Sequence, residues 1–383
     1  MDTKRFFIET VRCALNGETV DTGDFSDWKG LCRYLSLQNA WSFAHFALEK
    51  SSAPDEVKNL IESKFLSVVN QQVLQEYYQG LIFGKLDEEN VGYLPFKGAR
   101  LRRLYPHAEM RVSCDVDFMV RLQDVDRMRE VMGACGLTLD RKAGEADHDV
   151  WHADGGVTVE PHKSVMGLTD FSGYFVDFWD RTYLAGNNSA CRLLKPEDEY
   201  IFLIAHALKH FIHGGCGVKT LTDVKLFRKN NPDMDEEYLS AEFAKIKAVN
   251  FEKSIVKLAD LWLDGGEFDE NSLVLTDFIF DGGLYGTGKS QVAMKAGTDG
   301  KSAEHARRKY VTGRLFPPYK VMKVRYPVLN KHPILLPFCW IARIFNAIFT
   351  RRDTIKRNLR DCGNLSAEDV DRAAKVYDII TDD

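Results

Sequence analysis

The sequence predicts an α+β protein in which a small mixed β-sheet lies between helical regions. Three patterns predict this fold class. Residues 1–90 repeat apolar side chains at helical spacing, residues 91–190 contain short segments rich in β-branched and aromatic residues, and helical spacing returns after residue 190. Because 383 residues exceed what one hydrophobic core organises, we expect four regions: an N-terminal helical region (1–90), an α/β core (91–190), a helical domain (191–300) and a basic and apolar helical tail (301–383).

The elements expected before residue 190 follow from periodicity and from turn residues. Between residues 54 and 90 the apolar side chains form one stripe, which predicts a helix. Gly136 ends a helix that begins near Asp124, and Gly155–Gly156 indicates a hairpin between two strands. The expected strands are Tyr93–Phe96, Val112–Val120, Leu137–Arg141, His148–His152 and Val157–His162, and a short helix, Ala99–Tyr105, lies between the first two.

The elements expected after residue 190 are mainly helices. Pro196 suits the first position of a helix, because a proline there gives up no hydrogen bond. A glycine-rich stretch, residues 281–289, interrupts the helical pattern, and Ser366 with Asp369 marks the start of the last helix. The other expected helices are Thr222–Lys229, Glu236–Ala248, Glu252–Leu263 and Phe338–Phe349.

The charge is unevenly distributed. The whole chain has 51 basic and 56 acidic residues, a balance that argues against a protein built throughout to coat nucleic acid, and we find no DNA-binding motif. From Lys301 to Lys331, however, nine residues are Lys or Arg and only Glu304 is acidic. Such a segment suits an acidic acceptor, RNA or a membrane surface, or is simply a solvated helix face. With the apolar helix that follows, residues 301–350 predict a peripheral membrane contact or a helix docked on its own core.

Cysteine usage and hydropathy indicate a cytoplasmic protein. The eight cysteines form no C-x-x-C pair, which fits reduced thiols. The first residues lack the long apolar run of a signal peptide. The longest apolar run, Ile334 to Phe349, is interrupted by Pro337 and Arg343 and is shorter than the roughly 20 residues that a membrane-spanning helix needs.

Two strands carry acidic residues in a pattern that predicts a metal site. Successive side chains on a strand point to opposite faces, so Asp115 and Asp117 share one face while Val116 and Phe118 point into the core. Glu160 is the third acid, on the strand that follows. Carboxylates this close repel one another unless a cation lies between them, and their hard oxygens suit Mg²⁺ or Mn²⁺. Three of them can hold two ions roughly 3.5–4 Å apart; alternatively, the D-x-D pattern is a solvated strand edge.

A glycine turn and nearby cations predict a nucleotide-binding region next to these carboxylates. Residues 96–100 combine the end of a strand, a turn at Lys97-Gly98 and the start of a helix, which presents backbone N–H groups to an anion. Arg100 and Arg111 add positive charge, and His162 lies on the strand of Glu160. We therefore assign Lys97, Gly98, Arg100, Arg111 and His162 as candidate nucleotide-binding residues.

These motifs resemble one known family. Residues 94–162, with F-K-G-A-x-L, L-Y-P, C-D-V-D-F-M-V and V-E-P-H, are similar to the uncharacterised nucleotidyltransferase family of the DNA-polymerase-beta-like superfamily, and the similarity continues from Pro196 to Asp223. The resemblance implies a nucleotidyltransferase-type sheet, Gly98 in a phosphate-binding turn, and Asp115, Asp117 and Glu160 as metal ligands. The chain departs from the wider superfamily, which usually has Gly-Ser or Gly-Gly in this turn and often Asp as the third acid. Lys97 is therefore expected to replace a missing hydroxyl at the γ-phosphate.

The function implied by the resemblance is metal-dependent nucleotidyl transfer. An acceptor hydroxyl attacks the α-phosphorus of a nucleoside triphosphate, with ATP and hence AMP transfer as the expected case, and pyrophosphate leaves. Glu160 is expected to assist deprotonation of the acceptor. The acceptor is a small metabolite or antibiotic, a protein side chain or an RNA end. Replacing Asp115 and Asp117 together by Asn is expected to leave the unfolding midpoint intact or raised and to abolish metal-dependent triphosphate binding.

Two alternatives stay open at this stage. Residues Gly283 to Ser290 match the P-loop pattern G-x-x-x-x-G-K-S, which predicts an ATPase or kinase centred on Lys289. A P-loop needs a buried strand before it, and Phe278–Asp281 is the candidate; otherwise the stretch is a flexible glycine turn. The second alternative is a non-catalytic domain that binds a nucleotide or a partner without turnover.

Overall fold

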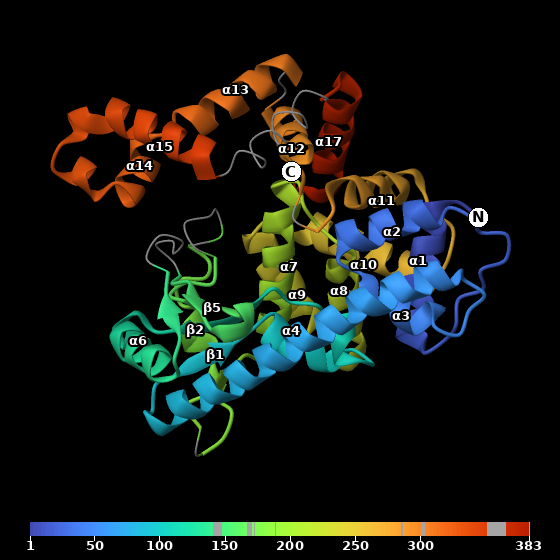
Figure 1. Cartoon of the computed structure of the whole chain (residues 1–383), viewed down its shortest axis with the longest axis horizontal. Helices are drawn as coiled ribbons and strands as arrows, with labels where there is room; N and C mark the ends of the chain where they lie inside the picture. Colours follow the sequence, from blue (N-terminus) through green and yellow to red (C-terminus); the bar gives the residue numbers. More distant parts are fainter. Residues whose placement is uncertain are drawn as a thin grey trace. The chain divides into compact units, whose positions relative to one another are not determined.

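A computed structural model describes most of the chain (Figure 1), namely residues 1–140, 148–166, 171, 173–187, 189–284, 286–299, 303–350 and 365–382. These residues form two compact units. The first contains Met1–Ala207, Val218–Phe268 and Asp382, and the second contains Leu208–Gly217 and Asp269–Thr381. The four-region division made from the sequence stays a prediction. Four residues that the sequence analysis covers lie outside the described residues: Arg141, Lys301, Tyr285 of the Gly283–Ser290 stretch, and Cys362, one of the eight cysteines.

The first unit holds a five-stranded mixed sheet. Its strands are β1 (Tyr93–Pro95), β2 (Asp115–Val120), β3 (Thr138–Leu139), β4 (Trp151–His152) and β5 (Thr158–His162). The order across the sheet is β1-β2-β5-β4-β3; β2 and β5 are parallel, and every other neighbouring pair is antiparallel. The predicted α+β class with a small mixed sheet is thereby confirmed. The hairpin between β4 and β5 turns at Gly155 and Gly156, whose φ angles of 74° and 81° favour glycine.

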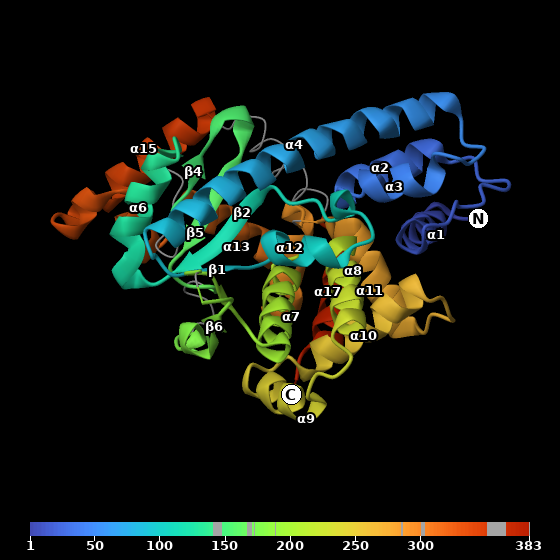
Figure 2. The ribbon, with the colours of Figure 1, turned by 90° about the horizontal axis from the view of Figure 1, so that it is seen from below.

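One face of this sheet packs on helices, and the other face carries the acids. Val116 and Phe118 of β2 and Val157 and Val159 beside them are buried in one apolar cluster. The cluster also contains side chains from α4 (Asp55–Glu88) and α6 (Val125–Ala134), and Figure 2 shows both helices beside the sheet. The alternation of side chains thus directs the predicted carboxylates to the opposite face.

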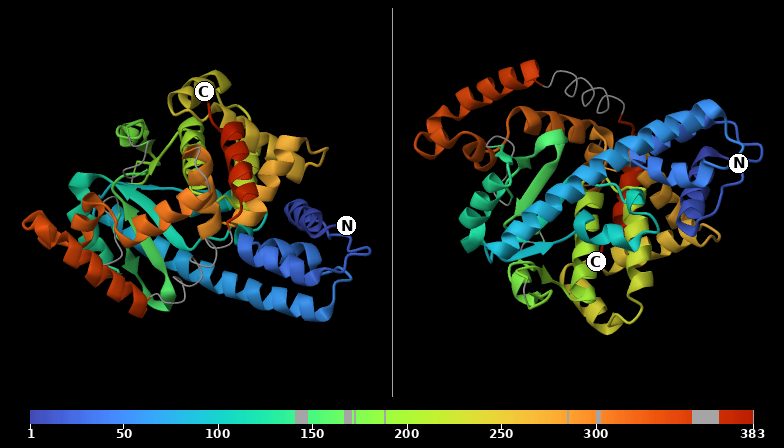
Figure 3. Two further views of the ribbon diagram at one scale, coloured as in Figure 1. Left: turned by 90° about the horizontal axis from the view of Figure 1, so that it is seen from above. Right: turned by 60° about the horizontal axis from the view of Figure 1, so that its bottom comes forward.

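Most of the rest of the first unit is helical (Figure 3). The first helix begins after the capping residue Asp2, whose carboxylate accepts hydrogen bonds from the backbone N–H groups of Lys4 and Arg5. The helix α7 starts at Pro196, as the sequence predicts, and continues into the second unit. The remaining helices are α1 (Thr3–Asn16), α2 (Trp28–Gln38), α3 (Trp41–Leu48), α5 (Gly98–Leu101), α7 (Pro196–Ile212), α8 (Val218–Asn230), α9 (Glu236–Lys245) and α10 (Val249–Leu263). A small ribbon, β6 (Tyr183–Leu184) and β7 (Arg192–Leu193), pairs separately.

The second unit is helical in its described residues. Helices α12 and α17 pack closely at Gly297, where a Cβ atom would lie only 2.6 Å from the backbone nitrogen of Ala374. The expected cap of the last helix is confirmed: Ser366 and Asp369 form a capping box. The helices are α11 (Glu270–Gly282), α12 (Gly288–Asp299), α13 (Ala303–Leu315), α14 (Tyr319–Arg325), α15 (Leu336–Thr350) and α17 (Ala367–Ile380). Among the described helices, none is both long and apolar enough to cross a bilayer.

The P-loop interpretation is wrong. Phe278–Asp281, the segment proposed as the preceding strand, lies inside α11, so a helix and not a strand leads into Gly283. Lys289 forms an ion pair with Asp369, with 2.8 Å between Nζ and Oδ1. The G-K-S letters mark the first turn of α12, where the hydroxyl of Thr287 accepts a hydrogen bond from the backbone N–H of Ser290. The motif therefore serves as a helix start and not as a phosphate loop.

Candidate functional site

The three predicted acids lie on one face of two adjacent parallel strands. Asp117 of β2 is paired in register with Glu160 of β5, and Asp115 is paired with Thr158. Oxygens of Asp117 and Glu160 and a ring nitrogen of His162 lie within 4.8 Å of one another. Asp115 stands two residues before Asp117 on the same face. Of the three residues that the sequence assigned as metal ligands, Asp117 and Glu160 thus belong to this group, and Asp115 lies beside them on the same face.

The charges of these acids act on one another. Burial raises the pKa of Asp115, and the neighbouring charge of Asp117 raises it further. Burial also raises the pKa of Glu160, with added contributions from Asp115 and Asp117. Two of the three carboxylates are therefore destabilised as anions, a situation that a bound cation relieves.

Asp117 is the exception, because it already has two partners. Its side chain is only 2% exposed, and its Oδ1 lies 2.9 Å from Lys97 Nζ and 2.8 Å from His162 Nε2. A carboxylate only accepts hydrogen bonds, so Nε2 of His162 donates. Although burial acts in the opposite direction, Lys97 and His162 hold the pKa of Asp117 well below its usual range.

Lys97 reaches Asp117 from an unusual backbone conformation. Its φ of 51° and ψ of −122° lie in a region that glycine adopts readily and other residues rarely. Such a conformation costs on the order of 1–3 kcal/mol. Burial alone would lower the pKa of Lys97, but the carboxylates of Asp117, Asp115 and Glu160 raise it above its ordinary value. The ammonium group therefore remains charged at the carboxylate cluster.

His162 is buried beside this pair, with 7% of its surface exposed. Burial lowers its pKa, while the hydrogen bond to Asp117 raises it, and the net shift is downward. The neutral ring has its proton on Nε2, since Nε2 donates to Asp117. Its other nitrogen, Nδ1, is buried and has no hydrogen-bond partner among the described residues. One orphaned acceptor thus lies at the edge of the site.

The predicted phosphate turn lies against the start of β2. A Cβ atom on Gly98 would come within 2.5 Å of Ser113 Oγ, so only glycine fits there. The hydroxyl of Ser113 in turn lies 3.5 Å from Asp115 Oδ1. This close approach keeps the turn beside the carboxylates, as the sequence predicts.

The two predicted arginines lie in ion pairs. Arg100 binds Glu199 with two hydrogen bonds of 3.2 and 2.9 Å, and both side chains are 12% exposed. Arg111 binds Asp223 of α8 in the same bidentate way, at 3.1 and 2.8 Å, and both side chains are 4% exposed. The hydroxyl of Tyr105 also donates to Asp223, at 2.6 Å. These arginines connect the segment around the turn to α7 and α8 and do not join the carboxylate cluster.

The sequence analysis missed one cation, Lys219. It lies one helical turn before Asp223 on α8, is half-buried, and forms no ion pair with any described residue. Burial and then the charge of Arg111 lower its pKa to about 8, although Asp223 and Asp115 act in the opposite direction. Its position among buried residues of α8, near the end of the Pro196–Asp223 stretch that resembles the family, is the signal that would have found it.

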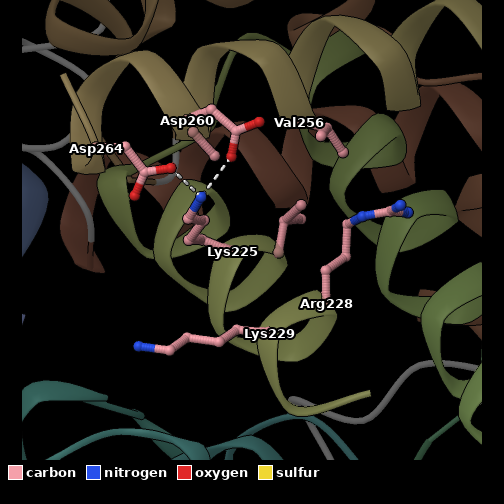
Figure 4. A pocket seen from close by; sticks show the side chains of 8 residues that line it. Lys225, Arg228, Lys229, Val256, Asp260 and Asp264 are labelled. Carbon is pink, nitrogen blue, oxygen red and sulfur yellow. Dashed lines mark hydrogen bonds and ion pairs between the residues drawn. The ribbon is translucent and has the colours of Figure 1, made fainter. Parts of the chain in front are cut away.

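A hollow of about 520 Å³ lies between α8 and α10 of the first unit (Figure 4). Lys225 of α8 lines it and pairs with Asp260 at 2.6 Å and with Asp264. None of the predicted site residues lines this hollow. Because it is lined by α8 and α10 and by none of the three acids, it is no part of the carboxylate site.

The residues of the carboxylate site fit a divalent cation. The cluster offers oxygens from Asp115, Asp117 and Glu160, which are the hard donors that Mg²⁺ and Mn²⁺ prefer. Burial first, and then the charges of the neighbouring aspartates, raise the pKa values of Asp115 and Glu160, and a bound cation would act against both effects. In chemical terms, the site can bind a cation together with a polyanion such as a triphosphate.

Comparison with known proteins adds one finding. A family model described as "Uncharacterised nucleotidyltransferase" matches residues 25–264. This range is more than half of the chain and includes all the site residues considered above, Lys219 among them. No curated protein and no solved structure is significantly similar to the chain.

Proposed function

Since the chain belongs to the family of uncharacterised nucleotidyltransferases, we propose that it transfers a nucleoside monophosphate, AMP from ATP, to a hydroxyl group of an acceptor. One observation carries this proposal: Asp117 and Glu160 lie side by side on parallel strands, with Asp115 on the same face. This arrangement supports binding of a divalent cation next to a glycine turn that accepts phosphate.

Asp115, Asp117 and Glu160 would hold Mg²⁺ or Mn²⁺. A divalent ion, when bound, neutralises the triphosphate and the departing pyrophosphate. Glu160 then has a second role. Its carboxylate would take the proton from the acceptor hydroxyl through an oxygen that does not contact the metal. His162 holds Asp117 in place through their hydrogen bond.

Lys219 and the glycine turn would bind the triphosphate. The ammonium of Lys219 has no carboxylate partner among the described residues, so an incoming phosphate would supply one. Gly98 admits the close approach of the backbone. Arg100 and Arg111, assigned to the nucleotide from the sequence, would act as positioning residues through Glu199 and Asp223.

Labelled ATP tests this proposal. The full chain is incubated with Mg²⁺ and ATP labelled at the α- or the γ-phosphate, with metabolite extract, total protein or total RNA as the acceptor. We expect α-label on one acceptor class, its loss after chelation of the metal or in Asp117→Asn, and its retention in Lys289→Ala. Transfer of γ-label would indicate a kinase instead. Wild-type transfer by Asp117→Asn, or binding of ATP without transfer to any class, would contradict the proposal.

We also propose that the second unit binds anionic membranes peripherally. On α15, Phe338, Ile341 and Phe345 share one face and are 68%, 53% and 60% exposed. The hairpin of α14 and α15 has its own small core around Met322 and Leu329, so these aromatic side chains are not needed to hold it together. The stretch from α13 to the start of α15 adds positive charge. Six of its cations are exposed and unpaired among the described residues: Arg307, Arg308, Lys320, Lys323, Arg325 and Lys331.

An apolar face with a basic flank fits an anionic bilayer better than a second copy of the same chain, because two basic surfaces repel. A cytoplasmic location is part of this proposal, and the described cysteines are free thiols. In vesicle pelleting, we expect the chain to bind phosphatidylcholine vesicles only when they also contain phosphatidylserine. The bound fraction should fall as the salt concentration rises. The variant Phe338→Ser with Phe345→Ser should lose binding, and Leu273→Ser, which alters another exposed residue, should not. Two outcomes would refute the proposal. The first is binding to RNA in place of vesicles, and the second is a wild type that does not bind vesicles but forms a dimer that the double variant abolishes.

A further inference from the structure

The number of metal ions at the site depends on Asp117. Two ions roughly 3.5–4 Å apart are close enough for one carboxylate to present an oxygen to each. The family resemblance implies that Asp115 and Asp117 contact both ions and that Glu160 is the third ligand. Asp117 is the central candidate for sharing, since it lies between Asp115 on its own strand and Glu160 on the neighbouring one.

One oxygen of Asp117 is already used by the protein. Its Oδ1 accepts from Lys97 Nζ at 2.9 Å and from His162 Nε2 at 2.8 Å. Among the described residues this leaves only Oδ2 for a metal ion. The ammonium of Lys97 thus stands where a second ion would need to contact the shared carboxylate.

The backbone shows that Lys97 is held there at a cost. At a φ of 51° and a ψ of −122°, glycine would be unstrained, yet the chain has a lysine. The backbone strain of a lysine at this position is offset only if its ammonium stabilises the carboxylates.

We propose that the ammonium of Lys97 takes the place of one of the two metal ions, so that this protein works with a single divalent cation. The charges agree with this arrangement, because one ammonium and one divalent ion together balance the three carboxylates. Lys97 is then a permanent cation of the site and does not contact the γ-phosphate. The inference rests on the proposed function only in that the carboxylates bind a divalent metal.

Counting bound Mn²⁺ by electron paramagnetic resonance on the full chain, without nucleotide, tests the inference. We expect one ion per chain for the wild type. Lys97→Gly suits the backbone conformation and removes the ammonium, so it should bind two ions, with the line broadening of a close Mn²⁺ pair. Lys219→Met is the matched control. It removes a cation that acts on Asp115 and leaves the two partners of Asp117 in place, so this variant should still bind one ion. Circular dichroism reports whether each variant is folded.

The outcomes separate the two proposals. Two ions in the wild type would overturn the role of Lys97 and leave the proposed function standing, and this count does not depend on any variant folding. One ion in a folded Lys97→Gly, or two in Lys219→Met, would also overturn it. No Mn²⁺ binding by the wild type, or equal binding by Asp117→Asn, would instead overturn the metal site itself.

Discussion

Replacing Lys219 by methionine should stabilise the first unit and weaken triphosphate binding at the same time. The ammonium of this half-buried side chain has no ion-pair partner among the described residues, which is costly for folding and useful for an anionic ligand. Methionine keeps the length of the side chain and removes the charge. A residue that serves only the packing of α8 would give the opposite result.

The magnitude follows from the pKa of Lys219. Its drop from 10.5 to about 8 corresponds to an upper bound of about 3 kcal/mol for the cost of the charged form at neutral pH. Because partial solvation reduces this figure, we expect a gain of about 1–2 kcal/mol, or several degrees in the unfolding midpoint. The gain should shrink as the pH rises from 8 toward 10.5, because the native wild type loses its proton in that range while the unfolded chain keeps it. A lost charged hydrogen bond should weaken binding of a non-hydrolysable ATP analogue roughly 10- to 100-fold.

Thermal unfolding at several pH values and calorimetric titration with the analogue check both effects. Lys229→Met is the control, since Lys229 is exposed on the same helix and pairs with no described residue; it should change neither quantity. A lower midpoint for Lys219→Met, or unchanged affinity for the analogue, would refute the reasoning.

Three further predictions concern the charged pairs. Asp115→Asn should raise the unfolding midpoint, because the pKa of Asp115 is raised and its anion is disfavoured. Asp117→Asn should instead lower the stability by about 1–3 kcal/mol, because the contacts with Lys97 and His162 are lost. The two midpoints should approach each other as the pH falls below 3.8, where both acids are protonated in the unfolded chain, and equal midpoints at neutral pH would contradict this prediction. Arg111→Met should cost about 3–5 kcal/mol in denaturant unfolding, because Asp223 stays buried without its partner; a cost below about 1 kcal/mol would be incompatible with that. Lys289→Ala breaks only a partly exposed ion pair, so a loss of at most about 1 kcal/mol and unchanged ATP binding are expected, and lost ATP binding would restore the P-loop interpretation.

The different environments of Asp115 and Asp117 change an expectation drawn from the sequence about the stability of the double variant. On repulsion alone, replacing both acids should leave stability intact or raise it. Repulsion does act on Asp115, but Asp117 is anchored by Lys97 and His162, contacts that residue spacing does not reveal. The double variant therefore combines a gain and a loss.

Local pattern predicted the parts of the fold that depend on neighbouring residues. Alternation along β2 correctly placed Val116 and Phe118 in the core and the two aspartates on the other face. The register that sets Asp117 beside Glu160 depends on parallel pairing across 43 positions, for which the family resemblance was the only guide. The environment of Lys219 arises from tertiary packing, and the G-K-S letters misled because a helix, not a strand, precedes them.

Within the described residues the chain passes between the two units four times, and this limits how the protein can be shortened. Residues Leu208–Gly217 belong to the second unit, where Phe211 stacks near Phe278 with 4.8 Å between ring centroids, and Asp382 returns to the first unit. There its carboxylate accepts hydrogen bonds from the backbone of Val249 at the start of α10. A protein ended after residue 268 would therefore expose an aromatic side chain and lose a helix cap, so the tail is better silenced by point substitution than by deletion.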